Sequence, residues 1–184
     1  MFLYVSLILH IPYILYLLYS NPSPLELYEK LKDRWYGKKM YSCILGIYSP
    51  YTMTINPVVE CYTCNHCKVS IDEAWGIKNP FNSVHAMALG NLGEFTSGLL
   101  MIEYLNNLSK IKKETHFKGS IIKIEMEYYK KASGKLSAVC NLENRCKNNI
   151  YTDIINTFRT DIINTSGETV CKVTSYWDIK EKSI

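Results

Sequence analysis

The chain lacks a large excess of charge of either sign. Its 184 residues include 21 Lys and Arg against 17 Asp and Glu, which gives a formal net charge of +4 at pH 7. The basic residues are dispersed, whereas nucleic-acid-binding modules gather them on one face or in an aromatic-containing motif. We therefore expect no nucleic acid partner. The small positive excess still suits an anionic coenzyme.

The first twenty residues lack charged side chains altogether. Residues 1–20 are nearly all apolar, and at roughly 1.5 Å per residue a helix of this length is about long enough to cross a bilayer. The segment also lacks the basic start and small-residue cleavage site of a signal peptide. A membrane anchor, a targeting peptide and a hydrophobic helix docked on the domain all stay open. Because basic residues follow the segment, an anchor would leave the domain facing the cytosol, and a targeting peptide would send it to an organelle.

The cysteines lack the arrangement of a zinc site. Cys61, Cys64 and Cys67 recur every third residue with His66 among them, but structural zinc sites use a second ligand pair beyond a longer loop. We therefore expect no metal, and we interpret these residues as ordinary or redox-sensitive thiols. An odd total of seven cysteines without a secretory signature favours a reducing compartment.

Length and composition indicate one domain with an N-terminal extension. We divide the chain into residues 1–20, the hydrophobic segment; residues 21–44, an N-terminal helix and linker; and residues 45–184, the folded domain. Within the second part, Leu25–Tyr36 is typical of a short amphipathic helix. We expect it to cover an open sheet edge or an acyl tunnel.

Apolar and β-branched runs separated by turn residues predict three β-hairpins. The first joins 53–62 to 68–74 across Asn65 and His66, the second joins 120–129 to 135–141 across 132–134, and the third joins 160–164 to 169–177 across Ser166 and Gly167. Strands on both sides of one long helical stretch indicate an α+β domain with an antiparallel sheet.

The helical stretch between Asn79 and Ile102 is almost uncharged and opens with turn residues. Asn82 or Ser83 is the expected N-cap, which places His85 and Ala86 in the first turn, where free N–H groups attract negative charge. Gly90, Gly93 and Gly98 each cost about 1 kcal/mol relative to alanine inside a helix. Three such residues suggest that another element packs closely against this helix.

Glu94 is an isolated acid in the middle of this stretch. A carboxylate among apolar side chains must be paired, protonated or used in chemistry, and we interpret Glu94 as used. It comes nine residues after His85, so it lies on the opposite face and roughly 13 Å along the axis. A symmetric dimer with antiparallel helices would bring the helix start of one copy beside Glu94 of the partner subunit.

The spacing of Asn79, His85, Ala86 and Glu94 resembles that of the hotdog-fold thioesterases. The resemblance is to the phenylacetate-pathway-like acyl-CoA thioesterases and to a related branch of unknown function, and it covers most of residues 52–180. It implies an α+β hotdog fold, in which a five- or six-stranded antiparallel sheet wraps a long central helix. It also implies a homodimer, with a tetramer left open.

The resemblance also implies a reaction and a role for each residue. The Ala86 amide would bind the carbonyl of an acyl-CoA or acyl-carrier thioester, and Glu94 of the partner subunit would act as general base or nucleophile. Asn79 would orient Glu94 or the water, while His85 would contact the thioester or shape the loop. Coenzyme A would enter as part of the substrate, with no other cofactor. One departure is that Ala86 and Met87 stand where the family often has two glycines.

Other interpretations remain open at this point. Lys130, Lys131 and Lys135 surround the Gly134 turn and would contact coenzyme A phosphates, or they form a solvated hairpin end. His85 as a first-turn residue, Asn79 as a loop cap and Glu94 as a hydrogen-bonded structural acid are the structural alternatives. A catalytically silent hotdog dimer that binds an acyl chain or lipid is the second function considered, and a hotdog hydratase or dehydratase is the third.

Overall fold

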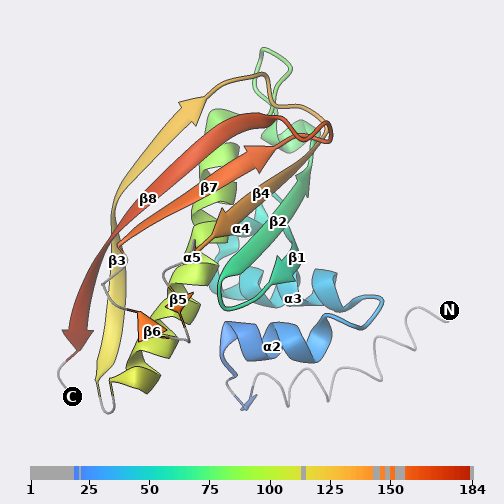
Figure 1. Ribbon diagram of the computed structural model, residues 1–184. Helices are drawn as coiled ribbons and strands as arrows, with labels where there is room; N and C mark the ends of the chain where they lie inside the picture. Colours follow the sequence, from blue (N-terminus) through green and yellow to red (C-terminus); the bar gives the residue numbers. More distant parts are fainter. Residues whose placement is uncertain are drawn as a thin grey trace, which may run out of the picture.

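The computed structural model describes residues 19–20, 22–112, 115–142, 146–147, 150–151 and 156–182 (Figure 1). Residues 1–18 are outside this description, so the expectations for the segment 1–20 stay predictions. Within the described residues, no helix combines the length and the apolar character that a membrane span requires.

One long helix packs against one six-stranded sheet. Helix α5 (Ala86–Ile111) lies behind the sheet in Figure 1. In spatial order the strands are β1 (Val58–Tyr62), β2 (His66–Asp72), β4 (Lys135–Asn141), β7 (Thr157–Ile163), β8 (Thr169–Lys182) and β3 (His116–Tyr128), and all pairs are antiparallel. This architecture confirms the α+β hotdog fold.

The shorter elements lie around this unit. Helices α2 (Pro24–Leu31), α3 (Gly37–Tyr48) and α4 (Pro50–Met53) precede the sheet, and the 3-10 helix η1 (Trp75–Ile77) precedes α5. Strands β5 (Cys146–Lys147) and β6 (Ile150–Tyr151) form a separate two-stranded sheet. Helix α2 begins with a capping box, in which Ser23 and Glu26 bond each other's backbone N–H groups.

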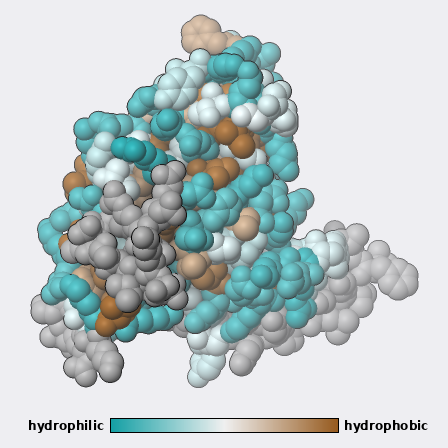
Figure 2. Space-filling model, viewed as in Figure 1, coloured by the Kyte–Doolittle hydropathy of each residue, from teal (hydrophilic) through white to brown (hydrophobic). Residues whose placement is uncertain are grey.

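Alternation along the central strands decides which face of the sheet the helix covers. Strands β4 and β7 bury every second side chain, among them Leu136, Ala138, Phe158 and Ile162. The side chains between them are polar or less buried, as expected for a sheet with one covered face. Figure 2 shows the face opposite the helix, which is mostly hydrophilic with separate hydrophobic patches.

Two of the three helix glycines allow the close packing that the sequence suggested. A Cβ on Gly93 would lie 2.5 Å from the Cβ of Val173 on β8, and one on Gly90 would lie 2.6 Å from the sulfur of Met126 on β3. Gly98 differs, because a Cβ there would meet only ordinary contacts at 3.6 and 4.0 Å. Gly90 and Gly93 therefore bring α5 close to β3 and β8.

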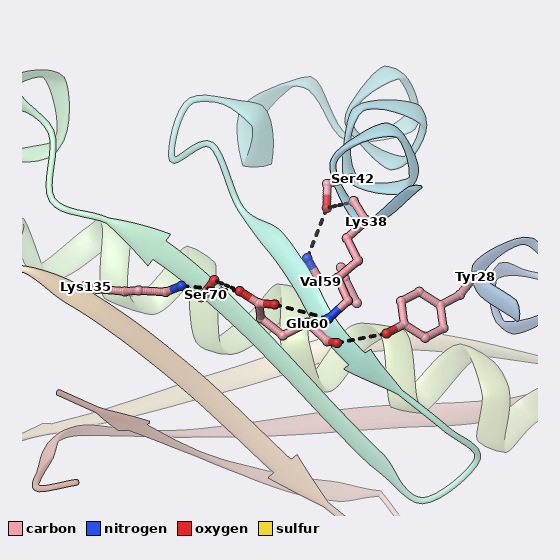
Figure 3. A network of polar contacts seen from close by, with 7 residues as sticks. All are labelled: Tyr28, Lys38, Ser42, Val59, Glu60, Ser70 and Lys135. Atoms are coloured by element: carbon pink, nitrogen blue, oxygen red, sulfur yellow. Dashed lines mark hydrogen bonds and ion pairs between the residues drawn. The ribbon is translucent and has the colours of Figure 1, made fainter. Parts of the chain in front are cut away.

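The N-terminal helices cover the β1 edge of the sheet (Figure 3). The Val59 N–H donates to the hydroxyl of Ser42 on α3 at 3.0 Å, and the hydroxyl of Tyr28 on α2 donates to the Glu60 carbonyl at 2.9 Å. The first helix of this region therefore covers an edge, as expected, although it ends at Leu31 and not at Tyr36. A second helix, α3, completes the cover and runs across the expected boundary between residues 44 and 45.

The Glu60 carboxylate binds the sheet to α3. It accepts hydrogen bonds from Ser70 at 2.9 Å and from Lys38 and Lys135 at 3.4 Å each. Burial by itself would raise the pKa of Glu60, but the Ser70 hydrogen bond and the two lysines outweigh it, and the pKa lies below its usual range. The carboxylate is therefore charged and paired at neutral pH.

The sheet order confirms two of the three predicted hairpins. Strands β1 and β2 pair, as do β7 and β8, although Met53 belongs to α4 and not to the first strand. The hairpin predicted across residues 132–134 is wrong, because β3 pairs with β8 while β4 pairs with β2 and β7. A turn residue marks where a strand ends, but the partner is selected by packing against the helix, which the local sequence does not contain.

We predict that Gly93→Ala destabilises the protein by about 1–3 kcal/mol, because the added methyl group overlaps Val173 in a filled core. Gly98→Ala on the same helix is the matched control, and it should stabilise by about 1 kcal/mol through helix propensity. Urea denaturation measures both values. Equal effects of the two substitutions would contradict the packing assigned to Gly93.

Candidate functional site

Asn79 shapes the loop that leads into α5. Its side-chain oxygen accepts hydrogen bonds from the N–H groups of Phe81 at 3.0 Å and Ser83 at 3.1 Å. The loop folds back on itself, because Lys78 and Val84 form an isolated antiparallel bridge. Asn79 therefore caps this loop with its side-chain oxygen, and its side-chain nitrogen bonds no residue that the structure describes.

The N-cap of α5 is His85, so the predicted cap at Asn82 or Ser83 is wrong. Asn82 has a positive φ of 56° and lies in the tight turn closed by Asn79, whereas His85 has the extended backbone of a cap, with φ −63° and ψ 140°. The His85 Nδ1 accepts a hydrogen bond from the Met87 N–H at 3.1 Å. Because Nδ1 accepts, a neutral ring has its proton on Nε2. The His85 side chain is exposed.

Ala86 is the first residue of the helix, and its N–H bonds no residue in the described part of the chain. Its carbonyl accepts a hydrogen bond from the Tyr128 hydroxyl of β3 at 3.3 Å. Because the N–H groups of a first turn have no partners within the helix, this end attracts negative charge. The neighbouring Met87 is 50% exposed, so its side chain borders this end of the helix.

Glu94 is partly buried, and its carboxylate forms neither a hydrogen bond nor an ion pair with any described residue. Burial raises the pKa of this carboxyl group, and no charged group offsets the effect. One of its oxygens lies 3.6 Å from the position of a Cβ on Gly98. Among the residues that the structure describes, Glu94 therefore has no hydrogen-bond partner of the kind that the structural alternative requires.

Ala86 and Glu94 both lie on the part of α5 that runs along β3 and β8. Tyr128 of β3 contacts Ala86, Met126 lies against Gly90, and Trp177 of β8 lies against Gly98. The two residues are nevertheless eight positions apart, about 12 Å along the axis. One copy of the chain therefore brings together Asn79, His85 and Ala86, but it does not bring Glu94 to them.

The three lysines around Gly134 have different surroundings. Lys130 forms an ion pair with Glu168, and Lys135 pairs with Glu60 at 3.4 Å. Lys131 is exposed and forms no ion pair with a described residue. Its loop is joined to the loop before α5, because the Ser83 hydroxyl bonds both the carbonyl and the N–H of Ala132, at 2.9 and 3.2 Å.

The cysteines provide no metal centre in the part of the chain that the structure describes, which contains no group of three or more His, Cys, Asp or Glu residues able to hold an ion. Cys64 is exposed, Cys61 is partly buried and Cys67 is buried. Burial raises the pKa of the Cys67 thiol well above its usual range. A thiol with a raised pKa is a poor nucleophile and a poor ligand.

Three residues behind Glu94 were not singled out from the sequence. The Ser97 hydroxyl lies 2.9 Å from that of Ser175, and the indole N–H of Trp177 donates to the Ser175 hydroxyl at 3.1 Å. Ser175 and Trp177 belong to β8, far along the chain from Glu94. No local pattern marks them, because only the sheet topology brings β8 against this turn of α5.

Comparison with known families gives a clear assignment. Residues 37–179 match the model of the family described as a domain of unknown function, DUF4442. The chain belongs to this family. The match covers α3 to β8, and so includes the sheet, the central helix and the helix that covers the β1 edge. No functionally curated protein gives a significant match to the chain.

Solved structures share the fold of this DUF4442 member. A Pseudomonas aeruginosa protein of unknown function, described as a probable thioesterase, has a TM-score of 0.63 at 14% identity, covering 76% of this chain and 92% of its own. A mutant thioesterase from Staphylococcus aureus gives 0.54 at 19% identity, covering 71% and 98%. A Haemophilus influenzae thioesterase gives 0.54 at 13% identity, covering 71% and 82%. The resemblance to hotdog-fold thioesterases is confirmed for the fold.

We predict that Glu94→Gln stabilises the protein at neutral pH. Burial raises the pKa of Glu94 above its value in the unfolded chain, so the folded state binds this proton more tightly. The group therefore supports folding at low pH and opposes it once the pH rises past its pKa and the buried carboxylate ionises. Glutamine has the same shape and stays neutral.

Thermal unfolding at a series of pH values tests this expectation. The variant should be more stable than the wild type at about pH 8, and the difference should disappear near pH 4. A Glu94→Gln variant that is less stable than the wild type at neutral pH would indicate a charged, paired carboxylate.

Proposed function

We propose that the chain hydrolyses acyl-CoA thioesters, or acyl-carrier thioesters, at sites shared by two copies. The observation that supports this most directly is the pair of unpartnered groups on one side of α5. The Ala86 N–H and the Glu94 carboxylate bond no described residue of the chain, and both border β3 and β8. Both residues are partly buried, so these groups are available to a ligand or to a second copy of the chain.

The β3 edge supports the dimer. The β1 edge is covered by α2 and α3, whereas no described strand or helix pairs with the outer edge of β3. This strand is 13 residues long, and its Ile121, Ile122 and Ile124 are 38%, 67% and 40% exposed. A long apolar edge pairs readily with another strand. Two β3 strands that pair about a two-fold axis would make one continuous sheet.

Such a dimer would complete the site. The two α5 helices would lie antiparallel along the joined sheet, so the helix start of one copy would approach Glu94 of the partner subunit. The Ala86 N–H would polarise the thioester carbonyl, helped by the helix N-terminus. The exposed Nε2–H of His85 is a second donor on the same end. Asn79 would contribute its free side-chain nitrogen.

The reaction then needs few groups. Glu94 takes a proton from water while the water oxygen attacks the carbonyl carbon, and the negative charge moves to the carbonyl oxygen beside the Ala86 N–H. When that charge returns, the carbon–sulfur bond breaks and the thiolate leaves. Because a thiolate is a good leaving group, it needs little protonation. A carboxylate whose pKa is raised by burial is a stronger base than an ordinary one, which suits this role.

One observation favours the second function, a dimer that binds acyl chains without turning them over. The half-exposed Met87 stands at the helix start, where its side chain narrows the approach to the Ala86 N–H. Binding of an acyl-CoA would still be expected from the same surface. Measurement of binding and turnover on the same samples separates the two functions.

We predict that the purified full chain hydrolyses members of an acyl-CoA chain-length panel and that Glu94→Gln lowers kcat about 100- to 10,000-fold, the usual contribution of a general base. Glu103→Gln is the matched control, since Glu103 lies on the same helix and is 4% exposed, and burial raises the pKa of its carboxyl group as well. Thiol release measures turnover, and calorimetry measures binding. Tight binding without turnover in the wild type would contradict hydrolysis.

The Ala86 N–H can be removed without disturbing the helix. Proline is favoured at the first helical position, and the extended backbone of His85 suits a residue before proline. We predict that Ala86→Pro folds normally and loses about 100- to 1,000-fold in kcat, the cost of one donor to the developing oxyanion. Unchanged turnover would remove this N–H from the mechanism.

Mixing the two inactive variants tests whether the site is shared. If Ala86→Pro and Glu94→Gln subunits exchange at random, about half of the dimers are mixed. Each mixed dimer has one intact site and one doubly damaged site, so the mixture should recover roughly a quarter of wild-type turnover. No recovery after confirmed subunit exchange would place both groups in the site of one chain.

A further inference from the structure

The indole of Trp177 lies between α5 and β3, beside one glycine of each element. A Cβ on Gly98 of α5 would lie 4.0 Å from the Cη2 atom of the indole. A Cβ on Gly119 of β3 would lie 3.6 Å from its Cε3 atom. Both are ordinary contact distances, so the ring lies against α5 and β3 at this level. The ring is partly buried and packs against the core.

A chain of hydrogen bonds fixes the orientation of this ring. The indole N–H of Trp177 donates to the Ser175 hydroxyl at 3.1 Å, the hydroxyls of Ser175 and Ser97 are 2.9 Å apart, and Ser97 donates to the Glu94 carbonyl at 3.0 Å. If Ser175 donates to Ser97, every N–H and O–H donor of this hydrogen-bond network has an acceptor. Ser175 and Ser97 are 0% and 1% exposed, so water does not compete for these bonds. The indole is thereby held to the helical turn that carries Glu94.

The side chains of Trp177 and Glu94 border the same space. An oxygen of Glu94 and the Cη2 atom of Trp177 lie within 4.0 Å of one point, the position of a Cβ on Gly98. Near Gly90 and Gly93, α5 also meets the apolar side chains of Met126 on β3 and Val173 on β8. An apolar ring at this place reduces the water that can reach the carboxylate.

Charged or titratable pairs involve the strands beside α5. On β3, Lys123 pairs with Glu125, and on β8 the Tyr176 hydroxyl donates to Glu125. Further along β8, Asp178 pairs with Lys180, and Lys172 pairs with Asp161 of β7. Burial is the one influence that acts on the pKa of Glu94. The surroundings of its carboxylate are therefore governed by apolar contacts and not by a charge.

We propose that Trp177 is a positioning residue for Glu94, whose indole closes one side of the carboxylate to water while Ser175 and Ser97 hold the indole against the same helical turn. The inference rests on the proposed role of Glu94 as the base. The protonation of Glu94 is nevertheless measurable without any turnover, so the two proposals can fail separately.

The direct test is an NMR titration of glutamate carboxyl carbons in the full chain, with the Glu94 signal assigned by its loss in Glu94→Gln. Replacement of Trp177 by leucine admits water, which stabilises the charged carboxylate, so the pKa of Glu94 should move to lower pH. Trp177→Phe should cause a smaller shift in the same direction, and it keeps the inference testable if the leucine variant does not fold. Trp35→Leu is the control, because Trp35 is 81% exposed. An unchanged Glu94 titration in the folded Trp177 variants would overturn the inference.

The second readout is the pH dependence of kcat/KM for an acyl-CoA substrate. Its acidic limb should move to lower pH in Trp177→Leu and stay in place in Trp35→Leu. A loss of activity with no movement of the limb would show a purely structural role and overturn the inference. If Trp177→Leu shifts the titration of Glu94 but the wild-type protein hydrolyses no thioester, the positioning role is supported and the proposed function is refuted.

Discussion

The structure depends on the close contact between one helix and two strands at one side of the sheet. Gly93 brings α5 against Val173 of β8, and Gly90 brings it against Met126 of β3. This contact defines the direction of a 26-residue helix across the sheet. It also determines that Ala86 and Glu94 border the β3 side. Without it, neither unpartnered group would lie near the open edge of the sheet.

One edge of the sheet is covered by other elements, and the other edge is not. At β1, side chains of α2 and α3 bond the outward backbone groups, and the Glu60 network holds α3 in place. At β3 no described element does so, and isoleucines remain exposed. A monomer with one covered edge and one open edge has a preferred direction of assembly. The same asymmetry leaves a partly desolvated carboxylate beside the open edge, which is unfavourable for stability and suits the proposed role of Glu94 as a base.

The sequence predicted the elements better than their connections. Periodic apolar residues and turn signals located the helix, most of the strands and two hairpins. The third hairpin was wrong because the Gly134 turn ends β4 without deciding its partner, and β3 pairs with β8 instead. The predicted N-cap lay too close to the start of the chain. Asn82 and Ser83 belong to a separate turn, in which the Asn79 side-chain oxygen accepts a hydrogen bond from the Ser83 N–H. The position of Trp177 beside the Glu94 turn could not be predicted, since Trp177 lies on β8 and Glu94 lies on α5, far apart along the chain.

By itself, the sequence determined the α+β class and the spacing of Asn79, His85, Ala86 and Glu94, because these follow from local patterns of residues. The cost of glycine in a helix predicted close packing at three glycines, which the structure shows at Gly90 and Gly93 but not at Gly98. Only the tertiary structure decided which strand lies at the open edge, which groups stay without a partner and what surrounds Glu94. These properties depend on long-range pairing, since burial and hydrogen-bond partners come from elements that are far apart along the chain.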